Sequence, residues 1–117
     1  MSYGYGPPQQ PPPNPNNGWL DITVEHGATQ FILMAVQPTI EIDGYQQKRP
    51  WGRHVIEMFP GQHMLRVWFD YMGQSGMSQL MVPIWTGQST VVTYKTPFFV
   101  TSSGTLTMMG SRPAGAW

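Results

Sequence analysis

The chain has 117 residues, and its six basic and six acidic side chains give a formal net charge of zero at neutral pH. This balance excludes the strong positive field with which a protein collects nucleic acid or an anionic membrane. Cysteine is absent, which excludes disulfides and thiolate zinc sites, and the length suits one domain with a modest core.

The first 17 residues are rich in Pro, Gln, Tyr, Gly and Asn and contain no aliphatic residue after Met1. Such a segment buries too little apolar surface to offset the entropy lost on ordering, so residues 1–17 are expected to form a disordered leader. Alternatively, its proline runs at 7–8 and 11–13 dock into an aromatic-lined groove. The segment lacks the basic and apolar regions of a signal peptide, and a cytoplasmic location is expected.

From residue 19 apolar and polar residues alternate, which predicts a strand that ends near Gly27 and has Asp21 on its wet face. Residues 31–36 then form a continuous apolar run of strand length. Such a run is typical of an inner strand covered on both faces, and we expect Pro38 to close it.

Two turn signals organise the middle of the chain. Residues 40–42 lead into the Asp-Gly pair at 43–44, which tolerates positive φ and marks a tight turn. The Pro-Gly pair at 60–61 follows an apolar segment at 55–59 and predicts a hairpin with the long strand 62–71.

Three further segments have the pattern of strands, at 79–85, 89–95 and 98–109, the last as a hairpin around 102–104. Pro83 lacks an amide donor, so the first of these segments is predicted at a sheet edge.

No long segment has helical spacing, so the sequence predicts an all-β fold. We expect a single antiparallel β-sandwich of seven to eight strands, immunoglobulin-like, over residues 18–109. Residues 110–117 are expected to form a flexible tail.

Several turn and strand residues fall in a familiar order: Ile40, Ile42, Asp43, Gly44, Gly52, Pro60, Gly61, His63, Leu65 and Val67. With Tyr71, Gly87 and residues 91–94, this order resembles the PEGA family of small bacterial β-sandwich domains over about residues 38–95. The chain departs from the family at Trp51-Gly52, where a small-residue turn is usual, and in its extra C-terminal segment. The resemblance implies a non-catalytic, often surface- or assembly-associated module, and it carries over no active site.

Candidate catalytic and metal-binding groups are few. His54, Glu57 and His63 fall in the predicted hairpin, but the two histidines are about two residue pairs apart along its ladder, so ordinary surface histidines are expected. Ser75 lacks the G-x-S-x-G spacing because Met77 stands where the second glycine is required. We therefore expect no enzyme activity, no metal and no other cofactor.

The segment from Tyr45 to His54, predicted as a loop, holds half of the basic residues of the chain. Aromatic and Arg side chains are common anchors of protein interfaces, so this segment is a predicted partner-binding surface. Its candidate contact residues are Tyr45, Lys48, Arg49, Trp51 and Arg53. The alternative is that Trp51 folds back onto the sandwich and the cations are merely solvated.

The predicted strands also carry more large apolar residues than the core of a two-layer sandwich can bury. Met64 and Trp68 share one strand face, and Met81 and Trp85 share another, whereas a two-layer sandwich buries one face of each sheet. The surplus either lies under residues 98–109 or forms a patch that, with an edge strand, binds another protein or a second copy.

Two other kinds of partner remain open. Trp51, Trp68 or Trp85 could form a stacking platform for a carbohydrate. The apolar run at 98–100 could contact a membrane surface, although few cations lie nearby.

Overall fold

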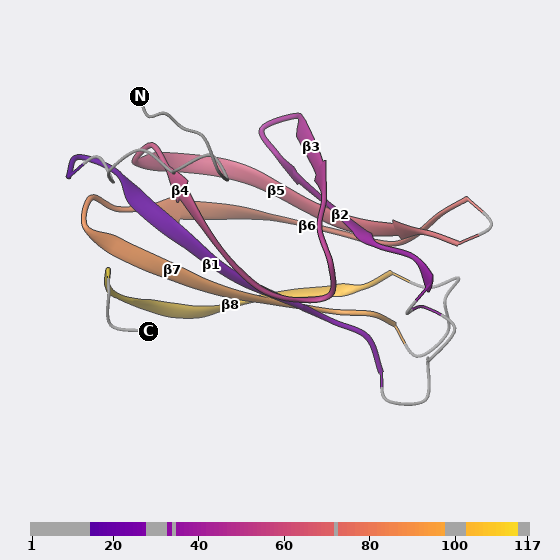
Figure 1. Cartoon of the computed structure of the whole chain (residues 1–117). Coiled ribbons are helices and arrows are strands. Elements are labelled where there is room, and N and C mark those ends of the chain that lie inside the picture. The colour runs from indigo at the N-terminus through magenta and orange to yellow at the C-terminus, as the bar shows by residue number, and fades with distance from the viewer. Residues whose placement is uncertain (1–14, 28–32, 34, 72, 98–102, 115–117) are drawn as a thin grey trace, which may run out of the picture.

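The computed structural model describes residues 15–27, 33, 35–71, 73–97 and 103–114 (Figure 1). Within these residues the chain forms eight strands: β1 (Gly18–Glu25), β2 (Pro38–Ile42), β3 (Tyr45–Lys48), β4 (Gly52–Met58), β5 (Gly61–Asp70), β6 (Gln74–Ile84), β7 (Gln88–Lys95) and β8 (Thr105–Pro113). The predicted all-β class is confirmed.

The strands form two four-stranded sheets, which lie as two layers in Figure 1. Sheet A has the order β4-β1-β7-β8, and sheet B has the order β3-β2-β5-β6. Neighbouring strands are antiparallel except for β1 and β7, which run parallel. The expected two-layer arrangement is therefore compatible with the structure, but the expectation of a wholly antiparallel fold is wrong at this pair.

An apolar core fills the space between the sheets. The buried side chains come from both layers: Leu20, Ile22, Val24, Met58, Val92 and Tyr94 from sheet A, and Ile40, Leu65, Val67, Val82 and Ile84 from sheet B. The hydroxyl of Tyr94 donates to the carbonyl of Gly76 across the layers at 2.6 Å. Burial raises the pKa of this phenol, so it remains a donor and fastens β7 to β6.

The Asp-Gly turn at 43–44 forms as predicted. Asp43 and Gly44 have φ values of 52° and 88°, and Ile42 pairs directly with Tyr45. Two consecutive positive φ angles are what a two-residue hairpin requires, so this local signal specifies the β2–β3 connection.

The apolar run at 31–36 is not the predicted inner strand at any of its described positions. Leu33 is buried in a short turn, in which the amide of Val36 donates to the Leu33 carbonyl at 3.1 Å. Pro38 begins β2 instead of closing a strand. Of the described positions in this run only Leu33 is buried, and a turn can bury a single apolar side chain as well as a strand can.

The predicted hairpin at 60–61 is also wrong. Strand β4 pairs with β1 in sheet A, whereas β5 pairs with β2 and β6 in sheet B. The Pro-Gly pair therefore carries the chain from one layer to the other. A turn signal shows where the chain bends but does not specify which strand it meets next.

The ends of the domain differ from the expected boundaries. Residues 1–14 of the expected leader lie outside the described residues, whereas the Asn16 and Asn17 carbonyls accept hydrogen bonds from Thr86 Oγ1 and the Gly87 amide. At the other end, β8 pairs with β7 and continues through Pro113, so residues 110–113 belong to sheet A instead of a tail.

Candidate functional site

The outer face of sheet B, the side turned away from sheet A, carries two methionines, of which Met64 is half-buried and Met81 is exposed. Met64 of β5 pairs with Met81 of β6, and Met81 is 48% exposed. One pair farther along this face, Arg66 Nε donates to Gln79 Oε1 at 3.2 Å. Because alternate residues of β5 and β6 fill the core, both methionines are left on the outside.

A shallow groove of about 430 Å³ lies on the same sheet. Its lining residues are Thr39, Gln46, Gln47, Lys48, Trp68, Asp70 and Gln74. Lys48 Nζ lies 3.5 Å from Asp70 Oδ2, and both side chains are well exposed, so this ion pair contributes little to stability and both groups can reach a ligand. Trp68 is only 6% exposed and therefore offers a rim of its ring instead of a full face.

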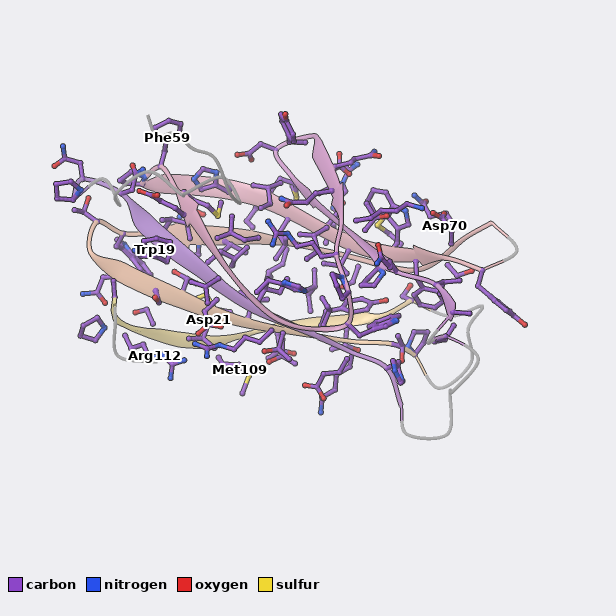
Figure 2. All side chains as sticks on the ribbon, in the orientation of Figure 1. Trp19, Asp21, Phe59, Asp70, Met109 and Arg112 are labelled. Atoms are coloured by element: carbon purple, nitrogen blue, oxygen red, sulfur yellow. The ribbon has the colours of Figure 1, made fainter. Side chains whose placement is uncertain are left out.

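Two exposed aromatic residues mark the end of sheet B where β5 begins and β6 ends. Gly61 pairs with Ile84, Phe59 lies just before the Pro60–Gly61 turn, and Trp85 follows Ile84 directly. Both aromatic side chains are substantially exposed. Figure 2 shows Phe59 and the groove residue Asp70 toward opposite ends of the molecule, so the apolar end and the polar groove are well separated.

Five of the seven predicted contact residues lie on or beside sheet B. Tyr45 is highly exposed at the start of β3, Lys48 and Trp68 line the groove, and Trp85 lies at the apolar end. Arg49 follows β3, and its Nε donates to Gln47 Oε1 at 2.7 Å. The predicted loop is thus mostly strand, and it spreads its residues over two sheets.

Trp51 lies within the body of the domain. Its indole Nε1 donates to the carbonyls of both Leu33 and Val36 at 2.9 Å. Its ring meets His26 edge to face with centroids 5.1 Å apart and lies 6.2 Å from the ring of Phe69. These contacts hold the backbone of Leu33 and Val36 beside the core, which matches the alternative in which Trp51 folds back.

Arg53 lies on sheet A and pairs with Asp21. Its Nε and Nη2 donate to the two carboxylate oxygens of Asp21 at 2.8 and 2.7 Å, and Arg112 Nη2 adds a third bond at 2.9 Å. Figure 2 shows Asp21 and Arg112 on the same side of the molecule. Asp21 is 2% exposed, although the alternation pattern placed it on a wet face. The arginines of β4 and β8 thus cover it and link both edge strands to β1.

The bonds of Asp21 with Arg53 and Arg112 predict a specific loss of stability at acidic pH. The hydrogen bond from Arg53, helped by Arg112, holds the pKa of Asp21 below its ordinary value. Since the folded pKa is lower than the unfolded value of about 4, the carboxylate stabilises the fold above that pH. This stabilisation is lost as the pH falls through the lowered folded pKa.

Urea denaturation between neutral pH and pH 2 tests this expectation. The loss of stability below about pH 4 should be smaller in Asp21→Asn than in the wild type. A remaining loss is expected from Asp43, whose pKa is lowered by its hydrogen bond with His63. Identical acid profiles for the two proteins would contradict this role of Asp21.

The histidines of the metal hypothesis lie in different sheets. His54 Nε2 contacts the Pro50 carbonyl at 2.7 Å, whereas His63 Nδ1 lies 2.5 Å from Asp43 Oδ2. In the part of the chain that the structure describes, no group of three or more His, Asp or Glu side chains could hold a metal ion. Ser75 Oγ donates to the carbonyl of Tyr71 at 3.0 Å.

Lys48 and Trp68 of this groove were sequence candidates, but Gln46 of β3, Asp70 of β5 and Gln74 of β6 were not. Gln46, Asp70 and Gln74 come together because β3 joins one side of β2 and β6 joins β5. Periodicity predicts which residues of a strand share a face but not which strands are neighbours, so no sequence signal pointed to this groove.

The comparisons with known proteins contribute no relative. The sequence matches no protein-family model, no curated protein and no solved structure. Among the described residues, no helix is long and apolar enough to cross a membrane. Function is therefore inferred from the surfaces of the two sheets.

Proposed function

We propose that this chain is a non-enzymatic protein-binding module whose partner contacts the outer face of sheet B. The outward-facing pair of Met64, which is half-buried, and Met81, which is 48% exposed, carries the proposal. Two methionines facing outward from adjacent strands form an adaptable apolar centre, because the unbranched thioether can repack against different partners. Arg66 and Gln79 lie beside them, so the apolar centre has the polar surround typical of protein interfaces.

Aromatic residues near this face supply further contact area. Trp85 is 46% exposed, and Tyr45 and Phe59 are more exposed still. Tyr, Trp and Arg are the residues most often found where interface energy concentrates, and large rigid side chains lose little entropy on binding. A partner lying along β5 and β6 could contact the methionines and Trp85 together.

We propose further that the domain is immunoglobulin-like or PEGA-like and that the protein is cytoplasmic. The immunoglobulin-like or PEGA-like identity is supported by the Asp43-Gly44 turn and by the long strand β5, which occupy the positions of the resemblance. A cytoplasmic location remains part of the same proposal. The proline runs of the leader, offered as a docking arm, lie outside the described residues.

Affinity capture from the native host, followed by quantitative mass spectrometry, tests the binding face. The full chain is compared with the double variant Met64→Gln, Met81→Gln and with a control double variant on the other sheet, Glu25→Gln, Thr93→Gln. We expect the first variant to lose at least about tenfold of the captured partner, equivalent to about 1.4 kcal/mol. Equal capture by both variants would contradict the assignment to sheet B.

A carbohydrate is the second candidate ligand, because the groove combines amide, carboxylate and ammonium groups with an aromatic residue. Gln46, Lys48, Asp70 and Gln74 could bind sugar hydroxyls, but Trp68 exposes little ring surface for stacking. Binding to a glycan array that is lost in Asp70→Ala, Gln74→Ala and kept in the methionine variant would favour this function. The apolar run at 98–100, offered for membrane contact, lies outside the described residues.

A further inference from the structure

Strand β8 forms one edge of sheet A, with β7 on one side and no described strand on the other (Figure 1). It has nine residues, so at roughly 3.4 Å per residue it presents about 30 Å of backbone edge. Amide and carbonyl groups along such an edge are a template on which another strand can form a ladder.

The other three edges carry features that oppose strand addition. Strand β3 has four residues, and β4 carries both basic and acidic side chains. On β6, Pro83 lacks an amide donor, and side chains of sheet A occupy two carbonyl groups. Thr90 Oγ1 donates to the Pro83 carbonyl and the Tyr94 hydroxyl to the Gly76 carbonyl, each at 2.6 Å.

Between Thr105 and Met108, β8 has neither proline nor charge. The charged residue farther along the strand, Arg112, is already paired with Asp21 of the same chain at 2.9 Å. The shift in register near Gly110 distorts the second half of the strand and leaves Thr105–Met108 regular. Two copies of this first half can therefore approach without repulsion between like charges.

Met108 supplies apolar surface at this edge. It pairs with Val92, which is fully buried in the core, and opposite residues of an antiparallel pair face the same side of a sheet. Met108 is nevertheless 39% exposed, because no described strand lies beyond β8 to cover it. Leu106, which packs against the core, lies on the same side of the strand.

We propose that β8 pairs antiparallel with β8 of a second copy of this chain, which joins two A sheets into one. A ladder centred on Thr107 places Leu106 of each copy opposite Met108 of the other, so the same apolar pair forms twice about a two-fold axis. The regular segment is short and buries less than the roughly 1,000 Å² of a stable interface, so the dimer dissociates on dilution.

Light scattering over a wide concentration range tests this dimer with the full chain. The average mass should rise from the monomer value of 13.2 kDa toward twice that value as concentration increases. Met108→Lys should keep the protein monomeric, because it places a charge at the edge of the core. Thr107→Lys serves as a second variant on the solvent side, where two ammonium groups would face each other in the dimer.

Disulfide trapping provides an independent arm, because the chain has no cysteine of its own. Thr107→Cys should form a covalent dimer under mild oxidation, whereas the control Gln62→Cys, exposed on β5 of the other sheet, should not. A constant mass of 13.2 kDa at every concentration, or equal trapping at the two positions, would overturn the proposal. Since β8 and the outer face of sheet B lie on different sheets, failure of either proposal leaves the other intact.

Discussion

Asp21→Asn is expected to lower the free energy of unfolding by roughly 2–4 kcal/mol, because the substitution removes the carboxylate that binds two arginines. Loss of one partner from a buried ion pair usually costs about 3–5 kcal/mol. The expected value is lower here, because the side chains of Arg53 and Arg112 are each more than 40% exposed and regain water. The edge strands β4 and β8 would both lose their arginine side-chain bonds to β1.

Thermal unfolding at neutral pH measures this effect. At about 4–8 °C per kcal/mol for a domain of this size, Tm should fall by roughly 8–32 °C. The matched control is Asp70→Asn, which removes the exposed ion pair with Lys48 and should change stability by less than about 1 kcal/mol. Equal shifts in Tm for the two variants would show that the buried carboxylate of Asp21 stabilises the fold no more than the exposed ion pair of Asp70 with Lys48.

Trp51→Ala is expected to lower the free energy of unfolding by about 3 kcal/mol, near the lower limit for removal of a large core aromatic side chain. The variant loses the packing of the indole against Phe69 and the two hydrogen bonds from the indole, which leaves the Leu33 carbonyl with the Val36 amide as its donor and removes the indole donor of the Val36 carbonyl. Trp51→Phe should lose less, because it restores most of the packing but not the hydrogen bonds.

Urea denaturation of the two Trp51 variants and of Trp85→Ala compares a half-buried indole, packed against the core, with an exposed one. Trp85 is 46% exposed and lies just beyond β6, so its removal should change stability by about 1 kcal/mol or less. Equal losses for Trp51→Ala and Trp85→Ala would mean that Trp51 does not hold the 33–36 turn. If the expected loss occurs, reduced binding by Trp51→Ala reports unfolding instead of a lost contact.

Local signals in the sequence predicted much of the secondary structure. The strands β1 and β5 and the tight turn at Asp43 and Gly44 depend on near neighbours in the chain, so the places of these elements were predicted correctly. Strand pairing depends on distant residues. The Pro-Gly pair at 60–61 has the same local form whether it closes a hairpin or crosses between layers, and only the packing of both sheets decides.

In the candidate site, too, the sequence predicted what depends on near neighbours in the chain and missed what depends on distant residues. The surplus of Met64 and Met81 was visible from alternation, and the structure places both on one outer face. The burial of Asp21 was not visible, because its cover comes from Arg53 and Arg112, which are 32 and 91 residues away along the chain. A carboxylate at an alternating position has the same sequence pattern whether water or two guanidinium groups surround it.

Site-specific photo-crosslinking in the native host tests most directly whether the outer face of sheet B binds a protein. A benzophenone side chain is introduced at Met81 in one protein and at Thr93, on the outer face of sheet A, in another. The account predicts a discrete crosslinked partner from position 81 and none from position 93 other than a second copy of this chain, because Thr93 pairs with Thr107 at the proposed β8 dimer edge. Crosslinks to another protein that are of equal strength from both positions, or that come from position 93 alone, would contradict the proposed binding face.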